Sequence, residues 1–258
     1  MKKITLLLLL LSVLFTFAVQ AQLFNIGKFG VGYFYLGPKL GGNASFNTID
    51  TGTGTEKKTN YGYQFGGVAK LGFTDKLSIQ PELIYTSKGY ATNNASMDMT
   101  AKNNYKYFGL PIVVKYAFMS IKGVQVYGSG GFYTDYMTGG ITKVTFGNND
   151  HGEEVKIEDF STYNRVDFGF SVGGGANIDL KNKDKLNVDL RFAFGTTDIY
   201  KNNSTSSSKN ISIQLSAVYL VDMTKWINFN VNKKDKQPDA YEENTAPAGG
   251  SKIDREED

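Results

Sequence analysis

The sequence contains no cysteine and very little proline, histidine or tryptophan. Its 258 residues include 5 Pro, 1 His and 1 Trp. Without cysteine, the chain can form no disulfide framework and can carry no lipid anchor on an N-terminal cysteine. No stretch sustains the 3.6-residue apolar repeat of an amphipathic helix. These absences argue against a disulfide-stapled domain and against a helical bundle.

Tyrosine, phenylalanine and glycine are abundant. The chain has 16 Tyr, 18 Phe and 29 Gly, a composition that favours β-structure rich in aromatic side chains. Basic and acidic residues nearly balance, with 28 Lys and Arg against 25 Asp and Glu. We therefore expect no basic surface for nucleic acid and no nucleic-acid partner.

The N-terminus has the layout of a secretory signal peptide. Residues 1–21 read MKKITLLLLLLSVLFTFAVQA, with Lys2 and Lys3 before an apolar run and Val19 and Ala21 placed for cleavage. An uncleaved anchor is the alternative, but the run is shorter than the roughly 20 residues of a spanning helix. The sequence predicts three parts: a signal peptide (1–21), a barrel (22–232) and a charged tail (233–258).

Strict alternation of apolar and polar residues is the strongest pattern in the chain. In RVDFGFSVGGGANIDL, residues 165–180, every even position from Val166 is apolar or glycine. Similar alternation predicts eight strands, over 33–46, 61–73, 77–88, 105–118, 124–137, 165–180, 186–194 and 211–221. Each is about long enough to cross a membrane at a tilt, which needs roughly 9 to 11 residues.

The connections alternate between short and long. Segments 74–76, 120–123 and 181–185 are short, whereas 48–60, 91–104, 139–164 and 200–210 are long and polar. This alternation predicts an all-β fold, an eight-stranded antiparallel up-and-down transmembrane β-barrel. In outer-membrane barrels the short turns face the periplasm, so we expect a multi-pass protein of the cell outer membrane with both termini periplasmic.

The two faces of the strands differ in their small and aromatic residues. Small residues gather on the polar face: Gly62, Gly66, Gly109, Ser129, Gly131, Gly169, Ser171, Gly173 and Gly175. Inside a narrow barrel they would make room for larger polar side chains. Tyr61, Tyr63, Phe73, Tyr85, Tyr116 and Phe118 lie near strand ends on the apolar face, where interfacial aromatic girdles belong. We therefore predict that the apolar face contacts lipid; a secreted lipocalin-like barrel with an apolar, ligand-binding interior is the alternative.

The predicted interior carries nearly balanced charge. Its cations are Lys39, Lys70, Lys88, Lys115, Arg165 and Arg191, and its anions are Glu82, Asp135, Asp167, Asp179 and Asp189. We predict a structural charge cluster of Glu82, Lys115, Asp167, Asp179, Asp189 and Arg191 that plugs the lumen, because eight strands leave room only for side chains. A path for protons or small molecules through the lumen is the alternative. We expect no catalytic residue, cofactor or bound metal.

One group of neighbouring side chains raises the question of whether the protein is an enzyme. His151, the single histidine, lies among Asp150, Glu153 and Glu154 in a long polar connection. Histidine with carboxylates can act as a general base or hold a cation, as in an outer-membrane lipid-modifying enzyme. A lone histidine among acids in a loop is more often simply solvated, so we predict a non-enzymatic protein.

Several segments resemble one family. "GPKLGGNASF", "VYGSGGFYTDYMTG" and "FGFSVGGGANIDL", and above all "LSIQPELIYTSKG" (77–89) followed by "YFGLPIVVKY" (107–116), are similar to PorT-type outer-membrane β-barrels. The similar segments span roughly residues 33–222. The resemblance implies an eight-stranded outer-membrane barrel and a link to type IX protein secretion, and it brings no catalytic motif.

The tail departs from that family. From residue 233 onward the chain has five basic and eight acidic residues and almost no apolar side chains, which predicts a disordered periplasmic segment. We expect an envelope protein with a structural or interaction role. Its predicted partners are outer-membrane lipids, the barrel assembly machinery that inserts it, and a periplasmic or secretion-system protein bound by the tail.

Overall fold

The computed structural model describes residues 31–49, 54–147, 152–201 and 207–224. The predicted signal peptide (1–21) and tail (233–258) lie outside these ranges. The described chain is almost entirely antiparallel β-structure, and its one helical element is the short 3₁₀ turn η1 (Lys181–Lys183). Among the described residues, no helix is both long and apolar enough to span a membrane.

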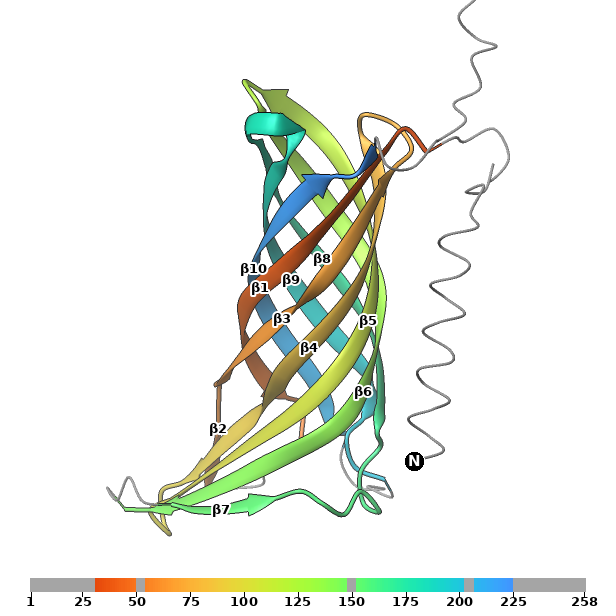
Figure 1. Cartoon of the computed structure of the whole chain (residues 1–258). Helices are drawn as coiled ribbons and strands as arrows, with labels where there is room; N and C mark the ends of the chain where they lie inside the picture. Colours follow the sequence, from red (N-terminus) through yellow and green to blue (C-terminus); the bar gives the residue numbers. More distant parts are fainter. Residues whose placement is uncertain (1–30, 50–53, 148–151, 202–206, 225–258) are drawn as a thin grey trace, which may run out of the picture.

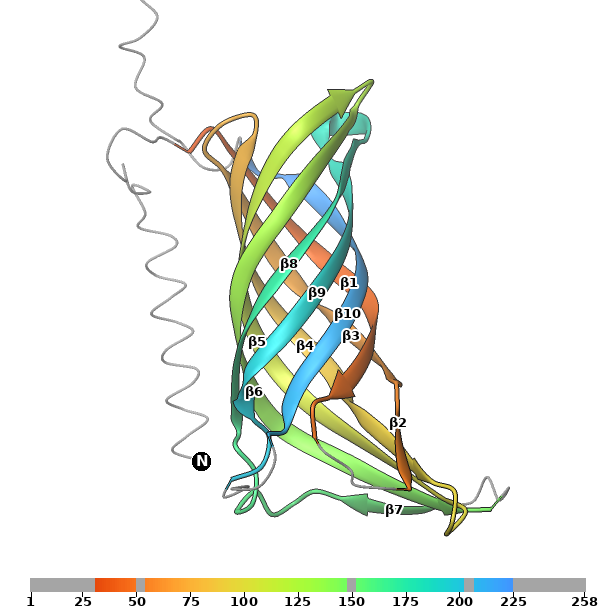
Figure 2. The same cartoon turned by 180° about the vertical axis from the view of Figure 1, so that it is seen from behind.

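Eight long strands form a closed ring. They are β1 (Tyr33–Asn47), β3 (Asn60–Gly72), β4 (Leu77–Asn94), β5 (Met99–Ile121), β6 (Val124–Phe146), β8 (Val166–Asp179), β9 (Lys185–Asp198) and β10 (Lys209–Asp222). Each pairs antiparallel with the next, and β10 pairs with β1 to close the ring. Figures 1 and 2 show the ring from opposite sides. The antiparallel, all-β prediction is confirmed.

The sheet has ten strands, two more than predicted. Strand β2 (Thr55–Lys58) pairs with β4, and β7 (Glu153–Lys156) pairs with β6. Segment 91–104, predicted as a free loop, is mostly sheet, and so are residues 139–146 of the predicted loop 139–164, because β4, β5 and β6 stay paired as far as Asn94, Met99 and Phe146. Here the strands carry Thr and Asn on both faces, so they lack the apolar alternation that marks a membrane strand.

The two ends of the ring differ. Turns 73–76, 122–123 and 180–184 lie at one end, which we call the turn end, together with the described chain ends near residues 31 and 224 (Figure 1). In the two-residue turn, Lys122 and Gly123 both have positive φ, as a tight type I′ hairpin requires. The opposite end, which we call the loop end, carries β2, β7 and the extended hairpins of β4, β5 and β6.

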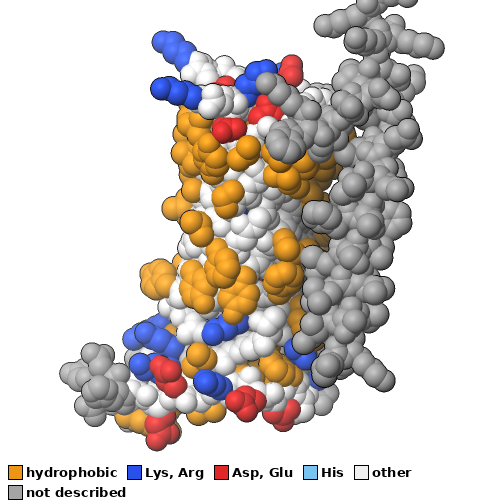
Figure 3. All heavy atoms as spheres, in the orientation of Figure 1, with side chains coloured by type: hydrophobic (Ala, Val, Ile, Leu, Met, Phe, Trp, Pro, Cys, Tyr) orange, Lys and Arg blue, Asp and Glu red, His pale blue; other side chains and the backbone are white. Residues whose placement is uncertain are grey.

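The apolar face of the strands points outward. Leu40, Leu110 and Phe170 are 67%, 53% and 61% exposed, whereas the polar side chains that alternate with them are buried. Apolar side chains form bands on the visible outer surface (Figure 3). The polar interior does not favour the lipocalin-like alternative, which needs an apolar interior.

Glycines on the inner face make room for neighbouring side chains. A Cβ added to Gly109 would lie 2.2 Å from Oδ1 of Asp135, and one added to Gly169 would lie 2.3 Å from the ring of Tyr133. At Gly62 the neighbour is a backbone oxygen instead, at 1.9 Å. The small residues of the inner face therefore allow both bulky polar groups and close strand packing inside the ring.

Candidate functional site in the barrel interior

Nine charged side chains are buried inside the ring. The cations are Lys39, Lys70, Lys88, Lys115 and Arg191, and the anions are Glu82, Asp135, Asp167 and Asp189; each is at most 6% exposed. They come from seven strands and reach the same interior because each occupies an inward position of the two-residue repeat. Isolated buried charges are very costly, so their partners decide whether the interior is stable.

Glu82 on β4 lies at the centre of the first cluster. Its two carboxylate oxygens accept hydrogen bonds from Nζ of Lys39 at 2.7 Å and from the guanidinium of Arg191 at 2.6 Å. Arg191 also pairs with Asp189 at 2.7 Å, and Gln80 donates to Glu82 at 2.8 Å. The cluster thus joins β1, β4 and β9 across the lumen, with every charge opposed by one of the other sign.

The network continues toward the turn end. Lys115 on β5 pairs with Asp189 at 3.0 Å and donates to the hydroxyl of Tyr127 at 3.1 Å. Asn187 donates to the same hydroxyl and to Asn177, which in turn accepts a hydrogen bond from Lys70 at 3.2 Å. Within the described chain, Lys70 is the one interior cation that forms no ion pair. Neutral amides and a phenol therefore extend the charged cluster through the turn-end half of the lumen.

A second cluster lies toward the loop end. Nζ of Lys88 pairs with Asp135 at 2.7 Å and with Asp167 at 2.8 Å. The same ammonium lies over the rings of Tyr107 and Tyr133, at 4.6 and 4.8 Å from their centroids. Two carboxylates and two aromatic faces surround this one cation, an arrangement that replaces much of its hydration shell.

Little free space separates the two clusters. A cavity of about 30 Å³ lies between them, lined by Lys39, Gln64, Glu82, Thr86, Tyr133, Asp135, Ser171, Arg191 and Gln214 among others. Such a volume holds about one or two water molecules. The side-chain nitrogen of Gln64 is buried there without a hydrogen-bond partner among the described residues. The cavity therefore suits a bridging water rather than a larger solute.

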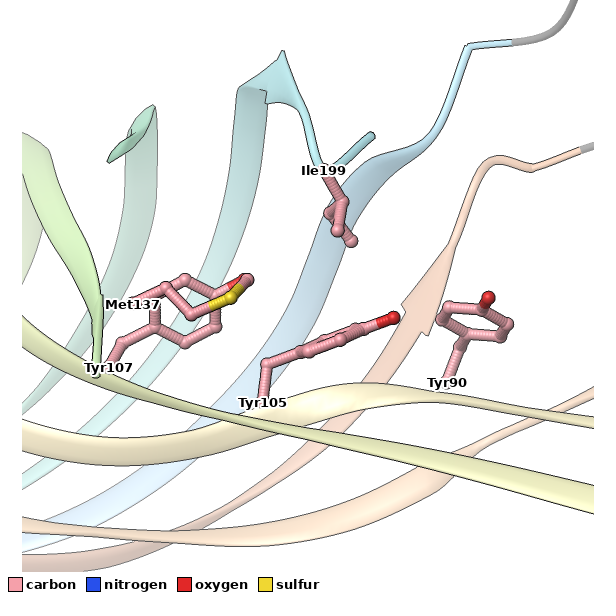
Figure 4. Packing of buried hydrophobic residues seen from close by; sticks show 5 residues of the cluster. All are labelled: Tyr90, Tyr105, Tyr107, Met137 and Ile199. Carbon is pink, nitrogen blue, oxygen red and sulfur yellow. The ribbon is translucent and has the colours of Figure 1, made fainter. Parts of the chain in front are cut away.

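An apolar cluster lies beyond the second cluster, closer to the loop end. Its buried members are Tyr90, Tyr105, Tyr107, Met137 and Ile199 (Figure 4). Phe160 and Tyr163, from the connection between β7 and β8, pack against it with Tyr200. The hydroxyl of Tyr200 forms hydrogen bonds with those of Tyr90 and Tyr105, at 2.8 and 3.0 Å. Segment 157–165 is thereby held against the mouth of the barrel.

Two hydrogen bonds stabilise that segment locally. The backbone N–H and the hydroxyl of Ser161 both donate to the carboxylate of Asp159, at 2.8 Å each. These donors lower the pKa of Asp159, which is exposed to solvent outside the membrane-spanning strands. The turn at 159–161 is thus an ordered part of the mouth.

The structure brings most of the predicted charge cluster together. Glu82, Lys115, Asp189 and Arg191 belong to one network, and Asp167 belongs to the second cluster around Lys88. One predicted member, Asp179, lies elsewhere. The side chain of Asp179 is 52% exposed at the end of β8 and pairs with Lys185, because the strand leaves the ring there. Arg165, which was predicted as an interior cation outside that cluster, lies instead at the loop-end rim, stacked on Tyr136 and Phe160.

Sequence reasoning missed the neutral members of the network. Asn177, Asn187 and Tyr127 connect the charges through hydrogen bonds, and Asn210 donates to Asp167 at 2.9 Å. All four occupy inward positions of the same alternation, which is the signal that could have found them. His151 and Asp150 lie outside the described residues. Among the residues that are described, no group of three histidine, cysteine or acidic side chains is placed to hold a metal ion.

Comparison with known proteins assigns the family. A family model described as "Outer membrane protein beta-barrel domain" matches residues 20–201. The chain belongs to this family. Membership in the outer membrane protein beta-barrel domain family agrees with the outward apolar face and supports an outer-membrane location. No curated protein matches the sequence.

Several solved structures are similar at low sequence identity. Neisserial surface protein A (NspA) is 13% identical with a TM-score of 0.42, covering 74% of this chain and 98% of that one. OprG from Pseudomonas aeruginosa is 13% identical with a TM-score of 0.43, covering 74% and 95%. Ail from Yersinia pestis is 14% identical with a TM-score of 0.39, covering 73% and 99%.

Proposed function

We propose that this protein is a non-enzymatic outer-membrane barrel whose lumen is closed by its own side chains and which serves as a structural or interaction component of the cell envelope. The observation that carries the proposal is the buried network in which Glu82, Asp189 and Arg191 link opposite walls of the ring. A conducting lumen needs water along its length. Here paired charges occupy the centre, and hydrogen-bonded amides fill the space toward the turn end.

Two further features support a closed lumen. The cavity beside Glu82 measures about 30 Å³, too little for a hydrated ion to pass. The apolar cluster around Tyr105 closes the mouth at the loop end, where segment 157–165 packs against it. Charge pairing and apolar packing therefore close successive levels of the same lumen.

Conductance in a planar lipid bilayer tests this proposal. We expect the full-length protein to produce no unitary current steps. Replacing Lys39, Glu82 and Arg191 together with serine removes the central cluster and should produce steps, provided that the variant keeps the faster gel migration of a folded, unboiled barrel. The exposed triple variant Lys76→Ser/Lys122→Ser/Lys183→Ser is the control and should stay silent. Regular steps from the unchanged protein would refute a closed lumen.

We also propose that the turn end faces the periplasm and that the tail (233–258) docks a periplasmic partner. The orientation is supported by the short turns at that end and by the described chain ends beside them (Figure 1). A link to type IX secretion is supported by the PorT-type resemblance alone. Deleting 233–258 should remove specific co-purifying proteins and reduce export of surface proteins. Unchanged co-purifying proteins would contradict docking by the tail, and unchanged export would contradict the link to secretion.

A further inference from the structure

The outward face of the loop-end extension is strongly basic. The extension comprises β2, residues 89–94 of β4, 99–106 of β5, 139–146 of β6, and β7. Its outward face carries five lysines: Lys58, Lys102, Lys106, Lys143 and Lys156. Two acidic residues, Glu56 and Glu154, share that face. We call these five lysines the basic face.

Strand register places the lysines side by side. Lys58 is paired with Ala91, Ala91 with Lys102, and Lys102 with Lys143. Directly paired residues of an antiparallel sheet project on the same face. Neighbouring strands lie about 4.8 Å apart, so the row forms one continuous basic strip rather than scattered charges.

Few of these charges are neutralised within the described protein. Lys143 pairs with Glu154 at 3.7 Å across two partly exposed side chains. Lys58, Lys102, Lys106 and Lys156 form no ion pair with any described residue. Lys102 lies directly opposite Lys143, and like charges in that position are destabilising. An anion bound between them would turn this repulsion into attraction.

The basic face begins where the apolar surface ends. Lys106 is two residues along β5 from Phe108, an exposed aromatic residue that is paired with Tyr85 and Tyr136 on the neighbouring strands. Two residues along a strand span about 7 Å. In the space-filling view, basic side chains lie directly beside the apolar band at the loop end (Figure 3). Lysines at this level have their stems against the hydrocarbon edge and their ammonium groups among lipid headgroups.

We propose that the basic face binds the anionic phosphate groups of lipid headgroups in the leaflet that borders the loop end. Lys102 and Lys143 hold one phosphate between them, and Lys58, Lys106 and Lys156 contact neighbouring headgroups. The bilayer is the source of the phosphate because the strip is continuous with the lipid-facing surface. This binding does not depend on a closed lumen. Its assignment to the outer leaflet rests on the orientation proposed above.

Lipid titration of the purified full-length protein tests the proposal. The protein is held in a non-ionic detergent, phosphatidylglycerol or phosphatidylcholine is added, and bound lipid is counted by native mass spectrometry. We expect a clear preference for phosphatidylglycerol. Each lysine near an anionic surface changes affinity about fivefold, so Lys102→Gln/Lys106→Gln/Lys143→Gln should weaken binding about a hundredfold. The matching triple change to arginine should preserve it.

Two controls make the result decisive. The variant Lys57→Gln/Lys201→Gln/Lys209→Gln removes three charges from the same end but not from the basic face, and should bind like the unchanged protein. Gel migration of unboiled samples checks that each variant is folded. An equal loss of phosphatidylglycerol binding in both glutamine variants would overturn the proposal, because lipid binding would then depend only on the net charge of the protein. If inorganic phosphate at the same concentration as phosphatidylglycerol displaced all of the bound lipid, the proposal would also be overturned, because the basic face would then bind free phosphate.

Discussion

At the scale of single residues, Arg191 holds two buried carboxylates together at the centre of the first cluster. It binds Glu82 and Asp189 from different strands. Removing one member of a buried ion pair typically costs about 3 to 5 kcal/mol, because its partner stays buried without compensation. We expect Arg191→Ala to lower the free energy of unfolding by about that amount. Urea unfolding in lipid vesicles, followed by the gel shift of unboiled samples, measures it.

Arg165 provides the matched control. It stacks on Tyr136 and Phe160 at the rim and donates to the backbone oxygen of Met137 at 3.2 Å, but it forms no ion pair with a described residue. Arg165→Ala should therefore cost only about 1 kcal/mol. Equal effects of the two substitutions would contradict a structural role for the interior charges.

The inner-face glycines allow a second residue-scale prediction. A Cβ on Gly175 would lie 2.0 Å from the backbone oxygen of Val188 and 2.6 Å from the hydroxyl of Tyr127. On Gly128, which faces outward, a Cβ would meet nothing within 4 Å. Overpacking costs about 1 to 3 kcal/mol, so Gly175→Ala should reduce stability in the same urea assay and Gly128→Ala should not. A neutral Gly175→Ala would show that the neighbouring strand shifts freely.

At the scale of elements, the sequence predicted the eight membrane strands because lipid imposes a repeat on them. Leu186, Val188 and Leu190 must all face hydrocarbon, whereas Asn187 and Asp189 must all face the lumen. Beyond the membrane both faces of a strand can meet water, and this constraint disappears. Strands β2 and β7 and the ends of β4 to β6 therefore carried no readable alternation. Their pairing follows the register that β4, β5 and β6 already have within the ring.

The same reasoning explains which site residues could be predicted. Charged side chains such as Glu82 and Arg191 are conspicuous on an otherwise small and polar face. Asn177 and Asn187 are ordinary in sequence, and their role depends on which strands the ring places opposite them. Asp179 obeys the alternation but lies where β8 ends, and a repeat does not show where a strand leaves the ring. Periodicity predicts which face of the sheet a side chain occupies, whereas closure of the ring determines which side chains lie opposite it.

The loop-end mouth allows a prediction about one element. Tyr105 is fully buried, contacts the rings of Tyr90 and Tyr163, and shares a hydrogen bond with Tyr200. Truncating a buried aromatic side chain costs about 3 to 5 kcal/mol of packing. Because Phe160 and Tyr163 of segment 157–165 pack on this cluster, Tyr105→Ala should loosen the segment while the ring stays folded.

Limited proteolysis measures that loosening. The segment contains Glu158, Asp159 and Phe160, so we expect cleavage there by an acid-specific protease in the variant much faster than in the unchanged protein. Tyr61→Ala, which removes an outward ring that is 79% exposed, is the control and should leave the cleavage rate unchanged. Cleavage of the segment at equal rates in all three proteins would show that the aromatic cluster does not close the mouth.

At the scale of the whole molecule, the membrane-spanning ring and the loop-end extension meet different surroundings. The ring satisfies the backbone hydrogen bonds of the membrane strands without leaving an open edge, which a bilayer requires. Past the bilayer, the same strands continue into an extension with its own charge pattern. Under the function proposed above, the side chains of the lumen contribute stability, and partners bind at the exposed surfaces of the two ends. Which end faces outward therefore determines which partners are available.

Because the chain has no native cysteine, single cysteines can report that orientation without background. Met97, in the hairpin between β4 and β5, and Lys76, in a turn-end connection, are both exposed. In intact cells a membrane-impermeant maleimide should label Met97→Cys, and it should label Lys76→Cys only after the outer membrane is permeabilised. Val113→Cys, buried in the lumen, should stay unlabelled in both. The reverse pattern would place the turn end outside, and the basic face would then meet the periplasmic leaflet.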